Sequence, residues 1–266
     1  MFEPFHSRLV SAFKSFEYHQ YMRPSDSNTA LADYCKAVLS GRIRDRWIDS
    51  QIDRLLPVYR VIKEIRANLF LNWFSLRFPS TPILYIIRHP CAVVLSHLQV
   101  SWEVDEDIAS FLAQDRLVAD FLSDKLELIR AAKTFEEKVA VVWCVTNLVP
   151  LSQFQGVQLN VFFYEHLCTQ IEEEIPRIFQ AIRHVYRPSV FRSAALPSVT
   201  SRLFSPIMTG GSKIDGWQKA LHAEQIRRVM AIVDAFGLSH YYDETPMPRA
   251  NAWVTPPVQP SVACNA

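Results

Sequence analysis

The stretch Ile83-Leu84-Tyr85-Ile86-Ile87-Arg88-His89-Pro90-Cys91-Ala92-Val93-Val94-Leu95-Ser96 decides how this sequence folds. Its first five residues form a continuous apolar run rich in β-branched side chains, which is typical of a strand buried on both faces of a parallel sheet. The run ends abruptly at Arg88, and Pro90 suits the first turn of a helix that continues from Cys91 to Gln99. The segment therefore predicts a strand, a tight turn and a helix.

The rest of the chain repeats this alternation of strands and helices. We expect helices at 30–39, 69–78, 171–182 and 222–236, a helical region at 105–154 broken near Asp115 and Thr134, and further strands at 58–62 and 159–164. Such alternation predicts an α/β fold with helices on both faces of a parallel sheet, where ligands bind at the carboxyl ends of the strands. Lys63, Arg88 and Tyr164-Glu165 would then share one edge, and residues 187–216 would form a mobile loop beside it.

The composition excludes several classes of protein. With 266 residues and a formal charge of +1, the chain has no global field for nucleic acid or an acidic membrane. Only six glycines are present, and no two of them form a phosphate loop of the Walker or dinucleotide type. The five cysteines have no CxxC spacing and the eight histidines show no ligand spacing, so we expect neither disulfides nor a metal.

The chain's surroundings are also predicted from its composition. Scattered cysteines favour a reducing compartment, and the residues after Met1 lack the apolar core of a signal peptide. The longest apolar stretch, Val139 to Leu151, is too short to span a membrane, which takes ~20 residues. We therefore expect a cytoplasmic protein; its oligomeric state is left open.

Arg88 and Ser96 together suggest an anion site. An arginine at the end of a strand, followed by a helix whose free N–H groups point back toward it, combines charge, a forked donor and a helix dipole. The hydroxyl of Ser96, one to two turns into that helix, could add a donor. The alternative is an arginine that caps a surface loop and a serine that bonds within its own helix.

At this point the chain resembles the sulfotransferases that use 3′-phosphoadenosine 5′-phosphosulfate (PAPS). Their 3′-phosphate motif is an apolar strand, Arg-Asp/His-Pro, and a helix with a serine eight residues after the arginine, as in Arg88 and Ser96. Further pieces match in the same order over roughly residues 1–242: Arg60-Val61-Ile62-Lys63, Trp143, Phe162-Phe163-Tyr164-Glu165-His166-Leu167 and Gly216-Trp217. The order of these pieces carries the resemblance, because each piece is weak alone.

The resemblance implies a role for each residue of a nucleotide site. Arg88 and Ser96 would bind the 3′-phosphate, and Tyr164 would line the adenine pocket unless it is a core tyrosine. Lys63 would neutralise charge on the sulfuryl group, although a solvated lysine is the competing interpretation. In the loop that closes over the nucleotide, the candidates are Ser198, Thr200 and Arg202.

The resemblance also suggests the group that deprotonates the acceptor. Glu3-Pro4-Phe5-His6 resembles the Glu-Pro segment of the carbohydrate-type members, whose glutamate is thought to act as general base. Sulfuryl transfer needs a base to take the proton of the acceptor hydroxyl. Glu3 is therefore the first candidate and His6 the second, against the simpler interpretation of Glu3 as an exposed terminal acid.

One part of the family pattern has no counterpart here. The 5′-phosphosulfate normally sits in a strand, loop and helix with a Pro-Arg/Lys-Ser-Gly-Thr type sequence shortly before the Glu-Pro segment, whereas here Glu3 is the third residue. We therefore expect a three-layer α/β sandwich with a central parallel sheet of the P-loop type, lacking its first strand and phosphate loop. A truncated sequence, a degenerate protein and completion by another chain are all open explanations.

These expectations give one principal function and two alternatives. Residues 1–244 would form a sulfotransferase-like domain and 245–266 a disordered, proline-rich tail. The domain would move a sulfuryl group from PAPS, without a metal, to a hydroxyl or amine acceptor that could be a carbohydrate. A non-catalytic module that binds adenosine 3′,5′-bisphosphate or a partner protein is the first alternative. A kinase-like phosphoryl transferase is the second, and the missing Walker loop disfavours it.

Overall fold

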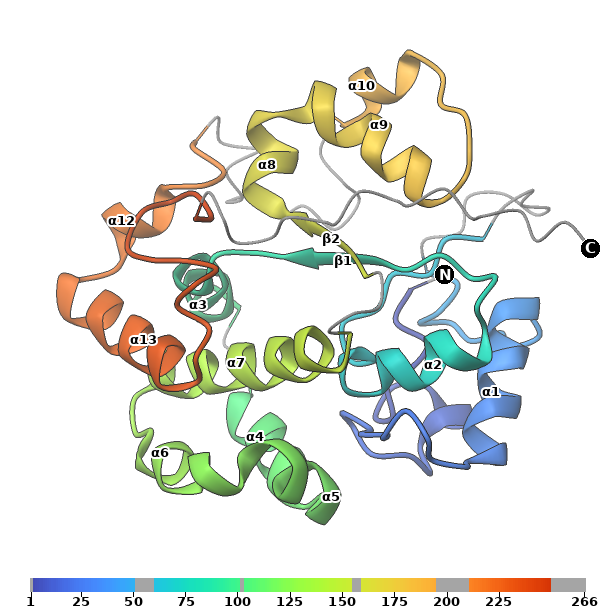
Figure 1. Cartoon of the computed structure of the whole chain (residues 1–266), viewed down its shortest axis with the longest axis horizontal. Helices are drawn as coiled ribbons and strands as arrows, with labels where there is room; N and C mark the ends of the chain where they lie inside the picture. Colours follow the sequence, from blue (N-terminus) through green and yellow to red (C-terminus); the bar gives the residue numbers. More distant parts are fainter. Residues whose placement is uncertain (1, 51–59, 101–102, 155–158, 195–210, 250–266) are drawn as a thin grey trace, which may run out of the picture.

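The computed structural model describes residues 2–50, 60–100, 103–154, 159–194 and 211–249. Two parallel strands, β1 (Leu84–Ile87) and β2 (Asn160–Phe163), pair from Leu84 opposite Asn160 to Ile87 opposite Phe163. Both were predicted, and both end beside each other because parallel strands paired in this register share their carboxyl ends. The mixed α/β class is thus confirmed, with a sheet of two strands in the described part of the chain (Figure 1).

The strand predicted at 58–62 is absent from the part of that range that the structure describes. Residues 58 and 59 lie outside the described residues, and Arg60 to Ile62 are not in a strand. A single parallel bridge joins Lys63 to Phe2 instead, outside the β1–β2 sheet. The expectation that Lys63 shares the sheet edge of Arg88 was therefore wrong, because the segment before Lys63 does not enter that sheet.

Helices make up most of the remaining structure. They are α1 (Thr29–Ser40), α2 (Leu71–Arg77), α3 (Pro90–Leu98), α4 (Val104–Leu112), α5 (Asp115–Leu117), α6 (Leu126–Ala131), α7 (Phe135–Gln153), α8 (Tyr164–Thr169), α9 (Ile171–Ala181), α10 (Ser189–Ala194), α12 (Gly216–Ala220) and α13 (Ala223–Ala235). A π-helical turn, Val118–Leu122, and 3-10 turns at Ser11–Phe13, Asn68–Phe70 and Ser123–Lys125 complete the described elements. The loop expected at 187–216 therefore contains α10, and α8 begins where β2 ends.

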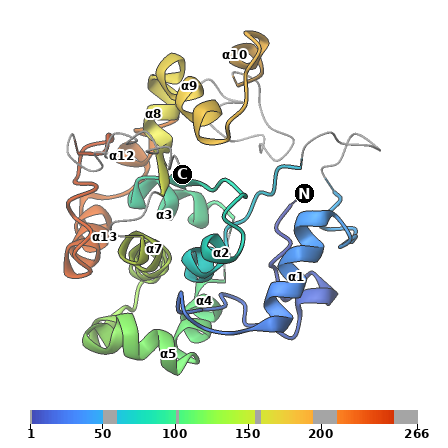
Figure 2. The same ribbon diagram turned by 45° about the vertical axis from the view of Figure 1, so that its right-hand side comes forward.

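Helix α7 is the centre of the main core. It starts at a capping box in which Thr134 and Glu137 satisfy each other's backbone N–H groups. Every residue from Val139 to Val145 is buried, so the helix is covered all round rather than along one stripe. Its neighbours are α2, α3, α4 and α13 (Figure 2).

The two faces of the sheet differ in how well they are covered. Helices α3 and α7 lie on one side of β1, and α8 and α9 lie on the other (Figure 1). Tyr85 and Ile87 are buried, whereas Leu84 is 36% and Ile86 56% exposed. The prediction that this strand is buried on both faces was wrong, because α8 and α9 leave these two side chains accessible.

A second, smaller core lies in the amino-terminal part of the molecule. It contains apolar residues from Phe5 to Phe74, including Tyr34 of α1 and Phe70, and it stands apart from the cluster around α7. Polar side chains join the two cores, among them Asn68, whose amide donates to the Thr146 carbonyl of α7. In the described part of the chain, every helix is too short or too polar to cross a bilayer.

Candidate functional site

Arg88 and Tyr164 meet at the carboxyl ends of the two strands. Each follows directly after the last residue pair of the ladder, Ile87 and Phe163. The Arg88 guanidinium carbon lies 4.6 Å from the centre of the Tyr164 ring, at a cation–π distance. Among the described residues, none accepts a hydrogen bond from the buried Arg88 Nε. This edge thus holds a half-buried guanidinium that an anion could satisfy.

The backbone that carries Arg88 is held on both sides. Trp143 Nε1 donates to the Arg88 carbonyl over 2.9 Å. The next N–H, that of His89, donates to Glu165 Oε1 over 2.9 Å, and the hydroxyl of Tyr242 donates to Glu165 Oε2 over 2.7 Å. Trp143 therefore has a structural role: its hydrogen bond positions the carboxyl end of β1.

His89 caps α3 from inside the core. Its Nδ1 accepts from the Cys91 N–H over 3.2 Å, and its Nε2 donates to the Asp243 carbonyl over 2.8 Å. The ring stacks on Trp217 at 4.3 Å between centres, so Trp217 has a packing role beside His89. Burial lowers the pKa of His89 to about 4, so this side chain is neutral at pH 7.

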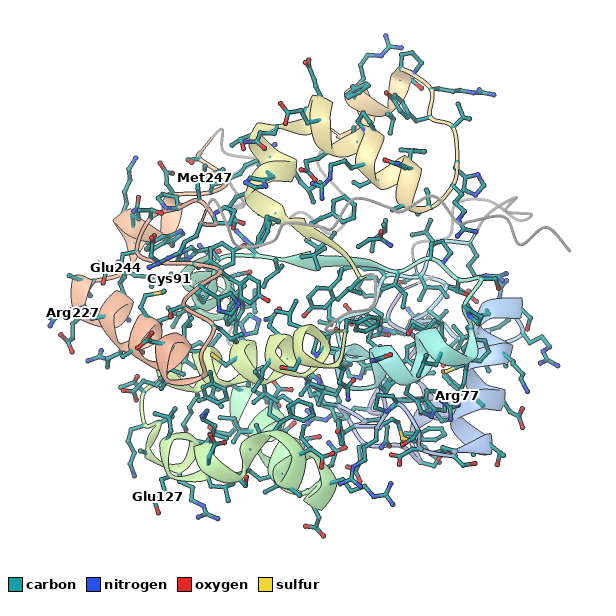
Figure 3. The ribbon with its side chains drawn as sticks, in the orientation of Figure 1. Arg77, Cys91, Glu127, Arg227, Glu244 and Met247 are labelled. Carbon is teal, nitrogen blue, oxygen red and sulfur yellow. The ribbon has the colours of Figure 1, made fainter. Side chains whose placement is uncertain are left out.

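The amino-terminus of α3 is partly covered. The segment that supplies Asp243 brings Glu244 close to Cys91, where the glutamate raises the pKa of the thiol although burial contributes more (Figure 3). A carboxylate at this position competes with any other anion for the helix dipole. Binding of an anion at this edge would therefore depend more on side chains outside α3 than on the N–H groups at the start of the helix.

Lys213 is a second cation near α8, and sequence reasoning missed it. Burial raises the pKa of the Cys168 thiol in α8, while the charges of Lys213 and Arg88 both lower it. Both cations therefore lie near the same thiol, one turn beyond Tyr164. Among the described residues, neither cation has a carboxylate partner within 4 Å. The clue available in the sequence was a lone lysine in a segment that had been assigned as loop.

Ser96 lies on α3, six residues after Pro90, and is half-buried. At 1.5 Å per residue, its Cα is about 9 Å along the helix from Pro90. Its role in phosphate binding remains a prediction. Ser198, Thr200 and Arg202 lie outside the described residues, so their placement is not tested.

Glu3, His6 and Lys63 form a separate group. Glu3 is 5% exposed, and its carboxylate pairs with Arg66 Nη1 at 2.7 Å and with Lys63 Nζ at 3.7 Å. Nearby Phe5 packs against Tyr34 of α1, which lies on the opposite side of the molecule from α3 (Figure 1). The structure thus does not bring these three residues to Arg88 and Tyr164.

His6 is enclosed by aromatic rings. The centres of Tyr18 and Trp47 lie 5.2 and 5.9 Å from that of His6. Burial, followed by the charge of Arg66, lowers the pKa of His6 to about 4. The side chain is therefore a neutral member of the smaller core. Both it and Glu3 remain predictions as catalytic bases.

Comparisons with family models, with curated proteins and with solved structures found no match for this chain. Among the described residues, no three His, Cys, Asp or Glu side chains are grouped so as to hold a metal ion. The candidate site therefore depends on its own geometry: two cations, an aromatic ring and a fixed backbone at the carboxyl ends of two parallel strands.

Proposed function

We propose that this protein binds PAPS by its 3′-phosphate at Arg88 and transfers the sulfuryl group to a hydroxyl or amine acceptor, a small molecule or a carbohydrate, in the cytoplasm. We also propose that the complete fold is a three-layer, P-loop-like sandwich. The observation that carries it is the half-buried Arg88 guanidinium over the Tyr164 ring, with an Nε that has no hydrogen-bond acceptor among the described residues. A guanidinium held this way can pair with a phosphate dianion through two parallel hydrogen bonds.

The surrounding residues support the nucleotide part of the proposal. Lys213 adds a second positive charge that, like that of Arg88, acts on the Cys168 thiol, and two positive charges suit the double charge of a 3′-phosphate. Arg88 covers one face of the Tyr164 ring and the Tyr164 hydroxyl hydrogen-bonds to Cys168, which leaves the ring edge for the adenine. Because Trp143 and Glu165 fix the backbone around Arg88, little ordering remains to be done on binding.

A specific observation favours the second candidate, a non-catalytic protein that binds adenosine 3′,5′-bisphosphate. Glu3, the expected general base, is buried in ion pairs with Arg66 and Lys63 rather than placed beside Arg88. A base must come within hydrogen-bond reach of the acceptor proton. Catalysis by Glu3 would therefore need the chain to rearrange. Nucleotide binding alone needs no such rearrangement.

Thermal stabilisation by adenosine 3′,5′-bisphosphate tests the claim that both candidates share. We expect wild type to be stabilised, by about 2.7 kcal/mol at a ligand concentration of 100 Kd, and Arg88→Ala to lose at least tenfold in affinity. Adenosine 5′-monophosphate, which lacks the 3′-phosphate, should stabilise far less. Arg130→Ala, on α6, is the matched control and should bind like wild type. An equal shift in wild type and Arg88→Ala would contradict the proposal.

Sulfate transfer separates the two candidates once binding is established. Wild type would be incubated with PAPS labelled in the sulfuryl group and with pooled hydroxyl and amine acceptors. Label in an acceptor that disappears in Arg88→Ala supports the enzyme. Nucleotide binding without transfer supports the non-catalytic module.

A further inference from the structure

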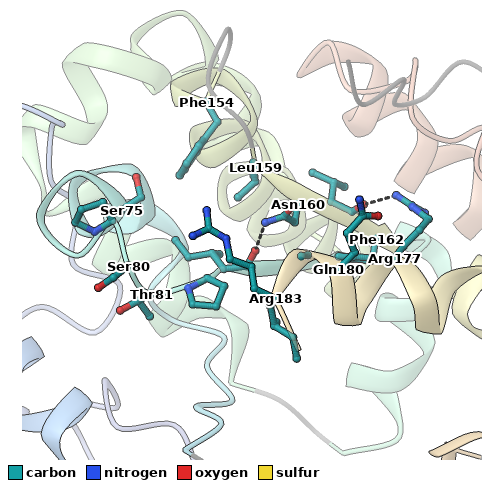
Figure 4. A pocket seen from close by; sticks show the side chains of 16 residues that line it. Ser75, Ser80, Thr81, Phe154, Leu159, Asn160, Phe162, Arg177, Gln180 and Arg183 are labelled. Atoms are coloured by element: carbon teal, nitrogen blue, oxygen red, sulfur yellow. Dashed lines mark hydrogen bonds between the residues drawn. The ribbon is translucent and has the colours of Figure 1, made fainter. Parts of the chain in front are cut away.

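A cavity of about 730 Å³ lies at the opposite end of the sheet from Arg88 (Figure 4). Its walls include the first residues of β2, the segment that leads into β1, and the last turn of α9. The strands are four residues long, so about 13 Å of sheet separates this cavity from the Arg88 edge. Its volume falls within the range usual for small-molecule sites, ~300–1,000 Å³.

The lining combines apolar walls with hydrogen-bond donors. Pro79, Pro82 and Ile182 contribute accessible apolar surface. Ser80, Thr81 and Gln180 contribute polar groups that have no side-chain partner among the described residues. Of the described residues that line the cavity, Arg177 and Arg183 are cationic and none is a carboxylate. A ligand that carries an anionic group on an apolar body fits this set of groups.

The two arginines are not equivalent. Arg177 pairs with the buried Glu174, and its guanidinium carbon lies 5.0 Å from the Phe162 ring centre, so its charge is already compensated. Arg183 has no ion-pair or hydrogen-bond partner for its side chain among the described residues. In Figure 4 it reaches from the end of α9 across the cavity toward the side lined by Ser75, Ser80 and Thr81. Arg183 is therefore the cation that a ligand can use.

The backbone of Arg183 gives independent support. It stands just past the end of α9 with φ 56°, where the N–H of His184 bonds back to the Phe179 carbonyl. This left-handed position after a helix usually holds glycine, because other side chains are strained there. An arginine at this place costs stability, and its side chain gains no hydrogen bond or ion pair with the described residues that would explain it.

We propose that this cavity binds a small organic anion, a carboxylate or a phosphate or sulfate monoester on an apolar body, with Arg183 as the anchor of the anionic group. Ser80 and Thr81 lie across from Arg183 and can donate hydrogen bonds to the same group or to its ester oxygen. The site is separate from the nucleotide site proposed above and does not depend on it.

Titration calorimetry with three probes tests this site. Benzoate and phenyl phosphate present the two anionic groups on one ring, and phenol presents the ring with a neutral hydroxyl. We expect wild type to bind at least one of the anions and not phenol, and the preferred anion then identifies the ligand class. Arg183→Gly should lower the affinity for that anion at least tenfold. Arg183→Lys should retain part of the affinity because it keeps the charge.

The glycine variant separates a binding role from a folding role. Since glycine suits φ 56°, Arg183→Gly should keep or raise the melting temperature while losing the ligand. Arg187→Ala removes an exposed arginine four residues on, outside the cavity, and should bind like wild type. Absence of binding by both anions, equal affinity for phenol, or unchanged affinity in Arg183→Gly would each overturn the proposal.

Discussion

Glu165 is a fully buried carboxyl group whose two oxygens have two different donors. Oε1 accepts from the His89 N–H, and Oε2 accepts from the hydroxyl of Tyr242. Burial raises the pKa of this carboxyl although both hydrogen bonds lower it. The glutamate therefore links the ends of both strands to the chain after α13, and it positions Arg88 through the neighbouring His89 N–H.

Replacing one of these oxygens tests that role. Glu165→Gln keeps the shape but puts an NH₂ group opposite one of two donors, so one buried donor loses its acceptor. We expect the free energy of unfolding to fall by about 1–3 kcal/mol in urea titrations. Glu172→Gln, an exposed change on α9, is the control and should cost under about 0.5 kcal/mol. A silent Glu165→Gln would show that the two hydrogen bonds contribute little.

The existence and direction of strand β1 could be predicted from its sequence. The difference in exposure between its two faces could not. An apolar run ending in Arg-His-Pro predicts a strand that leads into a helix, and both are present. The run contains no polar alternation, so nothing in it distinguished Ile86 from Ile87. Packing around the strand decides that difference, since α3 and α7 cover one face and α8 and α9, which are distant in the sequence, lie across the other.

The two adjacent isoleucines allow a matched test of this asymmetry. Ile87, 1% exposed, should lose about 2–5 kcal/mol of unfolding free energy on truncation to alanine, because a cavity forms in the main core. Ile86, 56% exposed, should lose under about 1 kcal/mol for the same truncation. Chemical denaturation of both variants measures the difference. Equal losses would mean that another surface covers Ile86 in solution.

On the scale of the whole molecule, the candidate site could be predicted only where its residues share an element or adjacent strands. Arg88 and Tyr164 follow paired strands, so their meeting was predictable. Lys63 had been assigned to the same edge on the assumption that residues 58–62 form a strand of the sheet, and Glu3 was a candidate only through the resemblance. The actual partner of Glu3, Arg66, and the second cation, Lys213, depend on chain packing that no local pattern encodes.

Buried histidines in both cores should make the whole fold sensitive to acid. Burial lowers the pKa of His6 and of His89 from 6.5 to about 4. Above pH 6.5 these groups are neutral whether the chain is folded or unfolded, so their contribution is constant. Between pH 6.5 and 4 only the unfolded chain takes up the protons, and each histidine then removes up to about 1.4 kcal/mol of stability per pH unit.

Glu64 opposes this loss over part of the same range. Burial raises its pKa from 4.5 to about 7, although the N–H groups of Phe5, Ile65 and Arg66 lower it. As the pH falls from 7 to 4.5, the folded protein therefore takes up a proton before the unfolded chain does, and stability rises. Glu64 thus offsets one of these two histidines down to pH 4.5 and neither of them below it, and Glu165, whose pKa burial also raises, acts in the same direction.

The resulting profile is specific enough to measure. The free energy of unfolding should be greatest near pH 6.5–7, fall moderately to pH 4.5, and fall more steeply from there to pH 4. Glu64→Gln should steepen the decline between pH 6.5 and 4.5, because the opposing proton uptake is gone. His89→Gln should make it shallower, whatever its effect on stability at pH 7. Urea titrations at half-unit pH steps give these slopes, and slopes that match wild type in both variants would contradict the assignment of the acid sensitivity to these groups.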